Sequence, residues 1–300
     1  MIDEPTIFSM LERARAFVDD GKNLHATQMY YALLEVAPHV EDAWLELANL
    51  FIDQGQYGPA EKVLSRASES VRDSAEFTFL VGKLYLKMGD SYRALASFRK
   101  VASVERTLPQ KLNVQLQYNL ALLYYRKENW RLAEHYFLRT KALDPKFPKI
   151  NESLAELQLK REAVREAMDS LQEAITIEPY SWIGHYLLGV ASVRLQRWHR
   201  ALEEFTQAID MNPKEPRAWQ MCGDVLLNLE RYDESEQYLR KALELNPDLT
   251  DAMVGFGFLF LKRQEFEKAG SYFKRALVSD PGHARAKQGE RELLHALKLR

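Results

Sequence analysis

A small side chain recurs along the chain at nearly constant spacing, and this regularity constrains the fold more than any other feature. The positions are Ala14, Ala48, Gly82, Ala121, Ala155, Gly189, Gly223 and Gly257. Successive positions lie 34 residues apart, except for one step of 39 residues between Gly82 and Ala121. Self-similarity at a fixed period of this size indicates a repeat architecture, in which each unit buries its apolar face against its neighbours.

Each repeat carries further markers at fixed offsets. A second small residue follows the first after twelve positions, at Ala26, Ala60, Ala94, Ala133, Ala167, Ala201, Ser235 and Ala269. A large residue stands four positions later, at Tyr30, Leu64, Phe98, Phe137, Leu171, Phe205, Leu239 and Phe273. Small residues let two helices approach closely, and a large residue one turn away fills the space beside them. The pattern therefore predicts eight helical hairpins.

Proline closes six of the eight units, because it lacks the amide hydrogen that a continuing helix needs. These residues are Pro38, Pro145, Pro179, Pro213, Pro247 and Pro281. Arg72 and Arg106 stand at the same place in the second and third units. The extra five residues fall at 106–113, where we expect a longer connection, with Pro109 in the first turn of a lengthened helix.

Composition excludes several classes of protein. The chain has 300 residues, of which 46% are hydrophobic and 28% charged, as in ordinary globular proteins. A net charge of −2 gives no general attraction to nucleic acid or to an anionic membrane. Apolar runs such as 254–261 are too short to span a bilayer, and the N-terminus does not read as a secretory signal. The single cysteine, Cys222, fits a reducing compartment, so we expect a cytoplasmic location.

The markers resemble those of the tetratricopeptide repeat, which has a period of 34 and a signature of Trp, Leu, Gly, Tyr, Ala, Phe and Pro. Trp44 and Trp219 stand at its tryptophan place, and the resemblance covers about residues 7 to 283. It implies an all-α fold, a right-handed superhelical solenoid of eight helix pairs with a C-terminal capping helix. The implied repeats are residues 7–40, 41–74, 75–108, 114–147, 148–181, 182–215, 216–249 and 250–283, followed by the cap at 284–300.

The last segment is expected to close the array. Glu290 and Arg291 stand where a further repeat would need apolar and small residues. Leu293, Leu294 and Leu297 are expected to cover the eighth repeat while the polar side of the helix meets water, as a terminal unit requires.

No catalytic or metal-binding pattern is visible. The sequence has no phosphate-binding loop and no pair of histidines at the i, i+4 spacing that places two ligands on one helix face. Cys222 occupies an apolar place of its repeat and His185 a helix-packing place, so both are interpreted as core residues. We therefore expect a non-enzyme that needs neither cofactor nor metal.

The resemblance implies that the first helices of the repeats line a concave groove that binds a protein or peptide partner. Aromatic and aliphatic anchors with a fringe of cations suit a peptide carrying acidic residues. The groove residues implied in repeats three to six are Phe79, Lys83, Tyr118, Asn119, Leu122, Tyr125, Arg126, Lys149, Tyr186, Val190 and Arg194.

Two alternatives remain. Lys83, Asn119 and Lys149 are in reach of the clamp with which some members of the family hold a C-terminal carboxylate, but Phe79 and Ser153 replace two of its cations. The second alternative is a structural protein that self-assembles through its terminal helices, suggested by the amphipathic last helix with Leu297 and Leu299.

Overall fold

The chain forms two compact units in a computed structural model that describes residues 3–67, 69–147 and 149–298. The units are Met1–Phe147 and Pro148–Arg300. We call them the first and the second unit and describe each by itself. Within the described residues all regular structure is helical, which confirms the all-α prediction.

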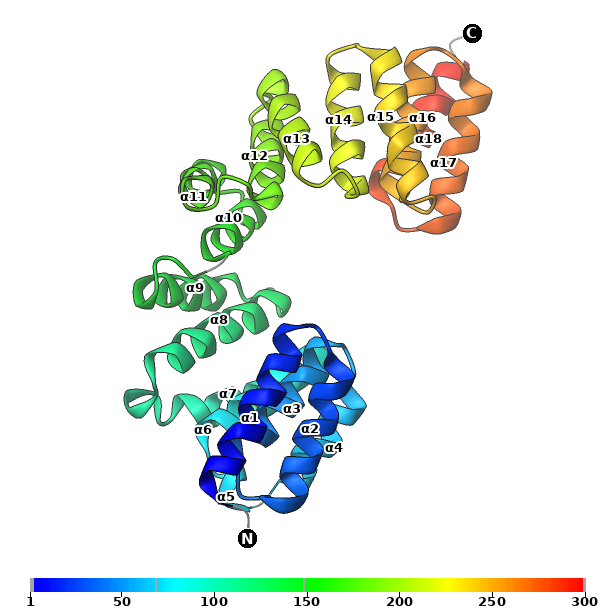
Figure 1. The fold of residues 1–300 in the computed structure, drawn as a ribbon. Coiled ribbons are helices and arrows are strands. Elements are labelled where there is room, and N and C mark those ends of the chain that lie inside the picture. The colour runs from blue at the N-terminus through cyan, green and yellow to red at the C-terminus, as the bar shows by residue number, and fades with distance from the viewer. Residues whose placement is uncertain (1–2, 68, 148, 299–300) are drawn as a thin grey trace. The chain divides into compact units, whose positions relative to one another are not determined.

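In the first unit the helices form hairpins, which run from blue to green in Figure 1. The paired helices are α1 (Glu4–Asp19) with α2 (Asn23–Val36), α3 (Glu41–Asp53) with α4 (Tyr57–Arg66), α6 (Ala75–Met88) with α7 (Ser91–Ala102), and α8 (Gln110–Arg126) with α9 (Trp130–Leu143). Two short elements lie in the connections, α5 (Glu69–Arg72) and the 3-10 helix η1 (Glu105–Thr107). They fall where arginine replaces the closing proline.

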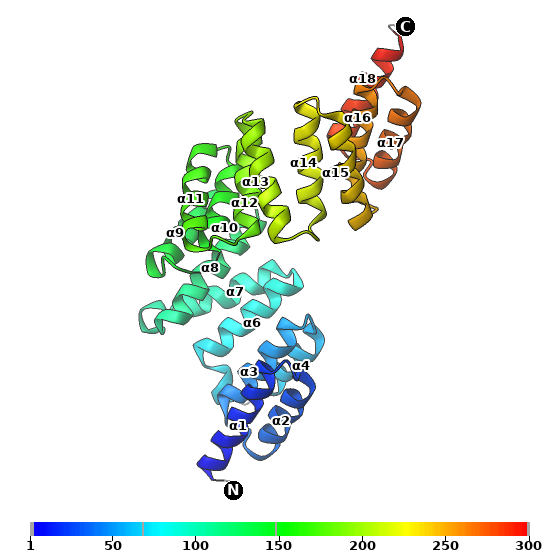
Figure 2. The same ribbon diagram turned by 45° about the horizontal axis from the view of Figure 1, so that its top comes forward.

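The second unit continues the same pattern and adds a final helix (Figure 2). Its pairs are α10 (Ile150–Lys160) with α11 (Val164–Ile177), α12 (Trp182–Arg194) with α13 (Trp198–Met211), α14 (Pro216–Asn228) with α15 (Tyr232–Leu245), and α16 (Thr250–Lys262) with α17 (Phe266–Ser279). The final helix is α18 (Ala284–Lys298).

The turn inside every hairpin contains one residue with positive φ. Glycine holds it in the first three hairpins, at Gly21, Gly55 and Gly89. In the other five the residues are Glu128, Glu162, Gln196, Glu230 and Gln264. The left-handed conformation turns the chain back within a few residues, and glycine adopts it without steric cost. Each of these residues follows the first small residue of its repeat by seven positions, so the turns recur with the same period.

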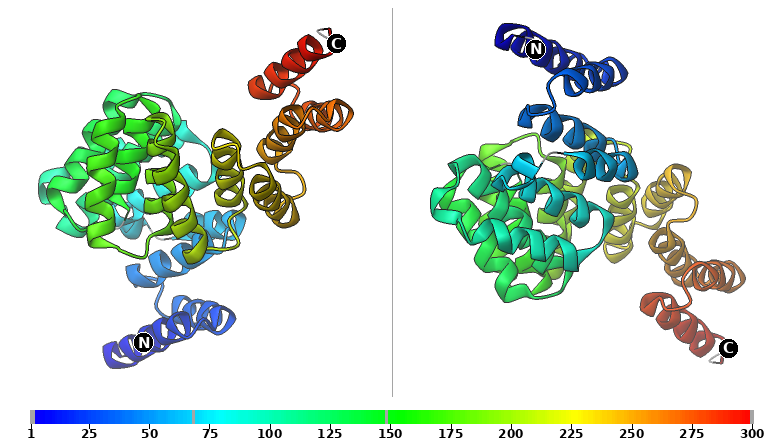
Figure 3. Two further views of the ribbon diagram at one scale, coloured as in Figure 1. Left: turned by 90° about the horizontal axis from the view of Figure 1, so that it is seen from above. Right: turned by 90° about the horizontal axis from the view of Figure 1, so that it is seen from below.

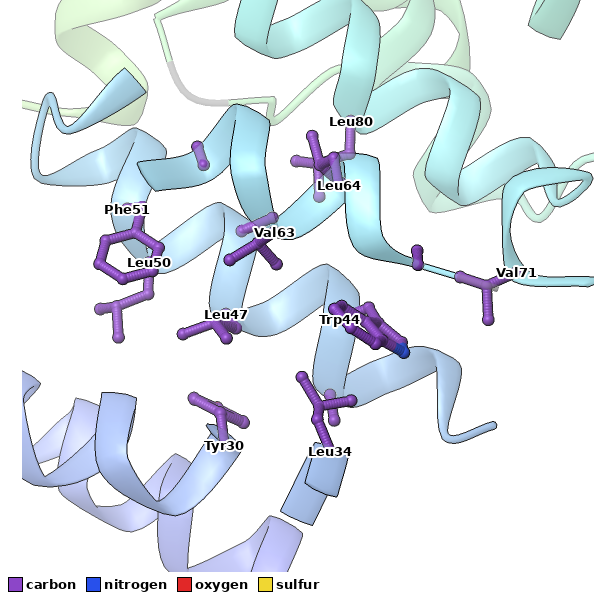
Figure 4. Close-up of a cluster of buried hydrophobic side chains, with 14 of the residues drawn as sticks. Tyr30, Leu34, Trp44, Leu47, Leu50, Phe51, Val63, Leu64, Val71 and Leu80 are labelled. Atoms are coloured by element: carbon purple, nitrogen blue, oxygen red, sulfur yellow. The ribbon is translucent and has the colours of Figure 1, made fainter. Parts of the chain in front are cut away.

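The small and large marker residues meet in the helix pairs as the sequence predicts. Ala48, Ala60 and Leu64 are buried, and Figure 4 shows Leu64 in a cluster with Leu47 and Trp44. Where the small residue is glycine, the large residue of the partner helix occupies the space that a Cβ atom would need. A Cβ atom built on Gly189 would lie 2.5 Å from Cε1 of Phe205.

Trp44 and Trp219, the two residues at the tryptophan place of the repeat, each form a hydrogen bond to the turn that precedes their own repeat. Nε1 of Trp44 donates to the Pro38 carbonyl at 2.8 Å, and Nε1 of Trp219 donates to the Pro213 carbonyl at 2.9 Å. In both units a hydrogen bond between residues six positions apart therefore joins a proline turn to the helix that follows it.

The 39-residue step is absorbed by a longer connection and a longer helix, as expected. The connection contains η1, and α8 has 17 residues where α3 has 13. Pro109 is the residue directly before α8 and not part of its first turn, which corrects the expectation for that residue.

The capping helix α18 packs against α16 and α17 (Figure 3). Leu293 is buried as predicted, and Gly289 lies against the ring of Phe273. The expectation for Leu294 and Leu297 is wrong, because their exposed fractions are 54% and 48%. A single helix presents only one face to the preceding hairpin, so both leucines lie outside that face.

Candidate functional site

A groove of about 790 Å³ lies in the first unit along the first helices of its four hairpins, α1, α3, α6 and α8. Apolar side chains from all four helices contribute to its wall. They are Val18, Leu45, Leu50, Phe79, Leu80, Leu86, Leu112, Tyr118 and Leu122, joined by Tyr30 of α2. Among these Val18, Leu45, Tyr118 and Leu122 are partly exposed, so apolar surface is open to a ligand along the groove.

At the α1 and α3 end Glu46 is held by two neighbouring side chains. Nη2 of Arg15 donates to Oε1 of Glu46 at 2.6 Å, and the hydroxyl of Tyr30 donates to Oε2 of Glu46 at 3.0 Å. The hydrogen bond to Glu46 is the largest cause of the raised pKa of Arg15. Burial raises the pKa of Tyr30, so its hydroxyl stays protonated and acts as a donor.

Lys83 connects α6 to α3. Its Nζ donates to Oδ1 of Asn49 at 2.6 Å and forms an ion pair with Oδ1 of Asp53 at 3.2 Å. Nδ2 of Asn49 donates in turn to Asp53 at 2.9 Å. The charge of Lys83 is thus balanced within the wall of the groove.

Helix α8 supplies the other wall. Tyr118 packs against Phe137 and Phe147, with ring centroids 5.8 and 4.9 Å away. Nδ2 of Asn119 donates to the Gln115 carbonyl at 2.8 Å. Nη1 of Arg126 donates to the Leu86 carbonyl at 2.7 Å and so caps the end of α6, a role for this cation that the sequence interpretation did not include.

Two lysines in this groove have no hydrogen bond or ion pair with any residue that the structure describes. Lys87 lies in the last turn of α6 and Lys111 in the first turn of α8, and both are exposed. Because the carbonyl that holds Arg126 is neutral, the α6 and α8 part of the lining has three cations that form no ion pair with the described residues, Lys87, Lys111 and Arg126, against one anion, Glu76.

Six of the eleven predicted groove residues therefore line one groove. They are Phe79, Lys83, Tyr118, Asn119, Leu122 and Arg126. Tyr125 belongs to the same helix but is not part of this lining. Its ring lies against Trp130, with a centroid distance of 5.4 Å.

The groove also takes in residues of the first two hairpins, which the sequence interpretation left out by centring on repeats three to six. Asp19 and Asp53 stand two periods and one period before Lys87. Extending the inward positions by 34 residues towards the N-terminus would have included them.

The other four predicted residues belong to the second unit. Lys149 is exposed at the start of α10 with a φ of 63°. Val190 is partly buried and packs in the core beside α13. Nη1 of Arg194 donates to the Leu159 carbonyl at 2.8 Å, which repeats the capping contact of Arg126.

Tyr186, the fourth of these residues, lines a groove of about 320 Å³ within the second unit. Asp224 lies in the same wall and is buried, and it accepts hydrogen bonds from Arg285 of α18 and from Nε2 of Gln220. Burial raises the pKa of Asp224, and Arg285 opposes that shift. The bond from Arg285 to Asp224 therefore joins the capping helix to α14.

The remaining chemically reactive candidates are buried or paired. Burial raises the pKa of Cys222 to about 12, so its thiol stays protonated at neutral pH. Nδ1 of His185 lies 2.8 Å from Oε2 of Glu204. Within the part of the chain that the structure describes, no group of His, Cys, Asp or Glu side chains could hold a metal ion.

The profile of the tetratricopeptide repeat matches residues 17–84, 79–148, 118–181, 186–250 and 221–284. The chain belongs to the tetratricopeptide repeat family. Proteins built from these repeats are generally non-catalytic scaffolds that act in protein–protein interaction. None of the described helices of this tetratricopeptide repeat chain is long and apolar enough to cross a membrane.

Solved structures support the fold. The chain is similar to one in the crystal structure of the APC/C hetero-tetramer Cut9-Hcn1, with a TM-score of 0.71 and 16% identity over 98% of this chain. It spans 57% of that chain. It is also similar to Pseudomonas aeruginosa pilF (TM-score 0.61, 18% identity, 73% of this chain and 97% of that one). The third is TTC0263, a thermophilic tetratricopeptide repeat protein of Thermus thermophilus (TM-score 0.53, 23% identity, 60% and 98%). A search of curated proteins finds no match.

Proposed function

We propose that this chain is a non-catalytic adaptor that binds a peptide segment of a partner protein in the groove of the first unit. One observation carries the proposal. The groove of about 790 Å³ is lined by first helices of four consecutive repeats and combines partly exposed apolar residues with polar side chains. This volume is in the range of about 300 to 1,000 Å³ that is typical of ligand sites, and mixed apolar and polar walls give both affinity and orientation.

The test is a substitution that places a larger side chain in the groove and leaves the core unchanged. Leu122 is partly exposed in the groove wall, so Leu122→Arg should block a bound segment while helicity by circular dichroism is unchanged. Tyr92→Arg is the matched control, because Tyr92 is 82% exposed on α7 and is not part of the lining. Partners captured from the cell of origin are quantified by mass spectrometry with each variant as bait.

We expect at least one protein that is captured by the unmodified chain and by the Tyr92→Arg control to be depleted more than tenfold with the Leu122→Arg bait. A tenfold loss corresponds to about 1.4 kcal/mol of binding free energy. Identical captured sets for all three baits would rule out the groove as the binding site.

A second candidate function is self-assembly, and the exposure of Leu294 and Leu297 on α18 favours it. The two leucines lie one helical turn apart and could pair with the same face of a second copy. Leu299 lies outside the described residues. Light scattering across a concentration series tests the idea, since a mass that stays monomeric at high concentration, unchanged by Leu294→Glu, would exclude it.

A further inference from the structure

The charges of the groove in the first unit are not mixed but separated along its length. The lining side chains of α1 and α3 include one cation, Arg15, and three anions, Asp19, Glu46 and Asp53, for a formal charge of −2. Those of α6 and α8 include one anion and four cations, for a formal charge of +3. The cations are Lys83, Lys87, Lys111 and Arg126, and the anion is Glu76.

One structural position shows this reversal most directly. The last turns of the four first helices place Asp19, Asp53, Lys87 and Arg126 at equivalent points of the repeat, 34, 34 and 39 residues apart. We call these four residues the charge column. All four line the groove, and the sign changes between the second and the third hairpin.

Within the described residues, neighbouring side chains neutralise only Asp53 among the four residues of the charge column. Asp53 is engaged by Lys83 and Asn49. Asp19 and Lys87 have no hydrogen bond or ion pair with the residues that the structure describes, and Arg126 is held only by a neutral carbonyl. The unbalanced charges are therefore negative beside α1 and positive beside α6 and α8, where Lys111 adds to them.

We infer that the segment bound in this groove carries its own charges in a fixed order. It would have basic residues against α1 and α3, acidic residues against α6 and α8, and apolar residues between them over Leu45, Phe79 and Leu122. Charge complementarity supports this assignment, because a like charge placed against either end is repelled while the correct order is attracted at both ends. The inference rests on the proposed function and specifies the chemistry of the partner.

The length of the segment follows from the spacing of the helices. Helix α3 packs on α6 and α6 on α8, and packed helices lie roughly 10 Å apart. Arg15 of α1 reaches Glu46 of α3, so if that step is taken as equal to the other two the four first helices span roughly 30 Å. An extended chain rises about 3.3 Å per residue, so roughly nine residues reach from Asp19 to Arg126.

The experiment is a selection of random peptides of roughly 12 residues, displayed on phage, against the full chain. An enriched peptide is then synthesised with a permuted twin of identical composition, in which the charged residues are interleaved. Both are measured by fluorescence anisotropy. We expect enriched peptides to carry Lys or Arg in one half and Asp or Glu in the other, and to bind at least tenfold more tightly than the twin.

Variants assign the effect to the groove. Lys87→Asp with Lys111→Asp should weaken the ordered peptide at least tenfold, because neither lysine is bonded to another described residue and both face the proposed acidic end. Arg99→Asp with Lys100→Asp is the control for charge alone, since both residues are exposed on α7, neither lines the groove, and the net charge changes by the same amount. It should change binding less than twofold.

The outcomes separate the inference from the function it rests on. Equal binding of the ordered peptide and its twin, or enrichment of peptides that are acidic throughout, would overturn the charge order while leaving the groove as a binding site. Enriched peptides that still bind the Leu122→Arg chain, or a selection that enriches nothing, would overturn the proposed function itself.

Discussion

At the residue scale, three hairpins place a glycine of the first helix against a phenylalanine ring of the second, at Gly82, Gly189 and Gly257. Gly189 and Phe205 are an example, since a Cβ atom on the glycine would lie 2.5 Å from Cε1 of the ring. Both residues belong to the same hairpin and the ring is fully buried. A methyl group can be accommodated only if the buried ring of Phe205, or the helix that carries it, moves.

We therefore expect Gly189→Ala to lower the free energy of unfolding by about 1–3 kcal/mol, although alanine favours helix formation. Gly58→Ala is the matched control, because Gly58 is helical with no atom within 4 Å of the added methyl group. That change should leave stability equal or raise it by up to about 1 kcal/mol. Urea unfolding measures both, and an unchanged Gly189→Ala chain would contradict the close packing.

Two carboxylates of the second unit give opposite dependences on pH. Burial raises the pKa of Asp224, so folding favours its protonated form. The hydrogen bond from Arg263 lowers the pKa of Glu236, so folding favours its ionised form. A raised acid pKa contributes stability that is lost as pH rises, and a lowered one contributes stability that is lost as pH falls.

The unfolding free energy of the unmodified chain minus that of Asp224→Asn should therefore decrease as pH rises above about 4. The same difference taken with Glu236→Gln should decrease as pH falls below about 5. Chemical denaturation at several pH values gives both curves. Slopes of the same sign would show that one of the two assigned environments is incorrect.

At the scale of elements, α18 shows how a terminal helix completes the array. It buries Leu293 against the last hairpin, while the neighbouring Leu294 is 54% exposed. We expect Leu293→Ala to destabilise the C-terminal hairpin by about 2–3 kcal/mol, as for a buried leucine, and Leu294→Ala to change stability by less than about 0.5 kcal/mol. Hydrogen exchange in α17 and α18 reads this out locally, and equal effects of the two variants would contradict the orientation of α18.

The sequence predicts the helix pairs well because the period ties each small residue to a partner at a fixed offset, as for Ala48 and Leu64. The orientation of α18 could not be predicted, since no ninth repeat supplies a register for Leu294 and Leu297. The hydrogen bonds from Arg126 and Arg194 to carbonyl groups could not be predicted from the sequence either. Spacing defines the position of a cation in the repeat, but a flexible side chain turns towards whichever neighbour lies closest in three dimensions.

At the scale of the whole molecule, each compact unit has buried clusters of its own. In the first unit they include Leu47 and Leu116, and in the second Leu188 and Leu259. Because repeats of a solenoid are stabilised mainly by their neighbours, each unit should fold without the other. We expect the fragments 1–147 and 148–300 to give helical circular dichroism and cooperative melting below that of the full chain. An unfolded spectrum for either fragment would show that its stability depends on the other.

The charge column also has a consequence for the speed of recognition. Electrostatic attraction acts before two surfaces touch, over about 10 Å at 0.1 M salt. A segment that carries opposite charges at its two ends is therefore rotated towards the correct alignment while it is still diffusing. Interleaved charges lose this guidance, so the penalty falls on the association rate as well as on the lifetime of the complex, and salt reduces it. The reversal of charge between Asp53 and Lys87 would thus favour the association of segments with the correct charge order. This selection would act before a segment contacts Leu45, Phe79 or Leu122.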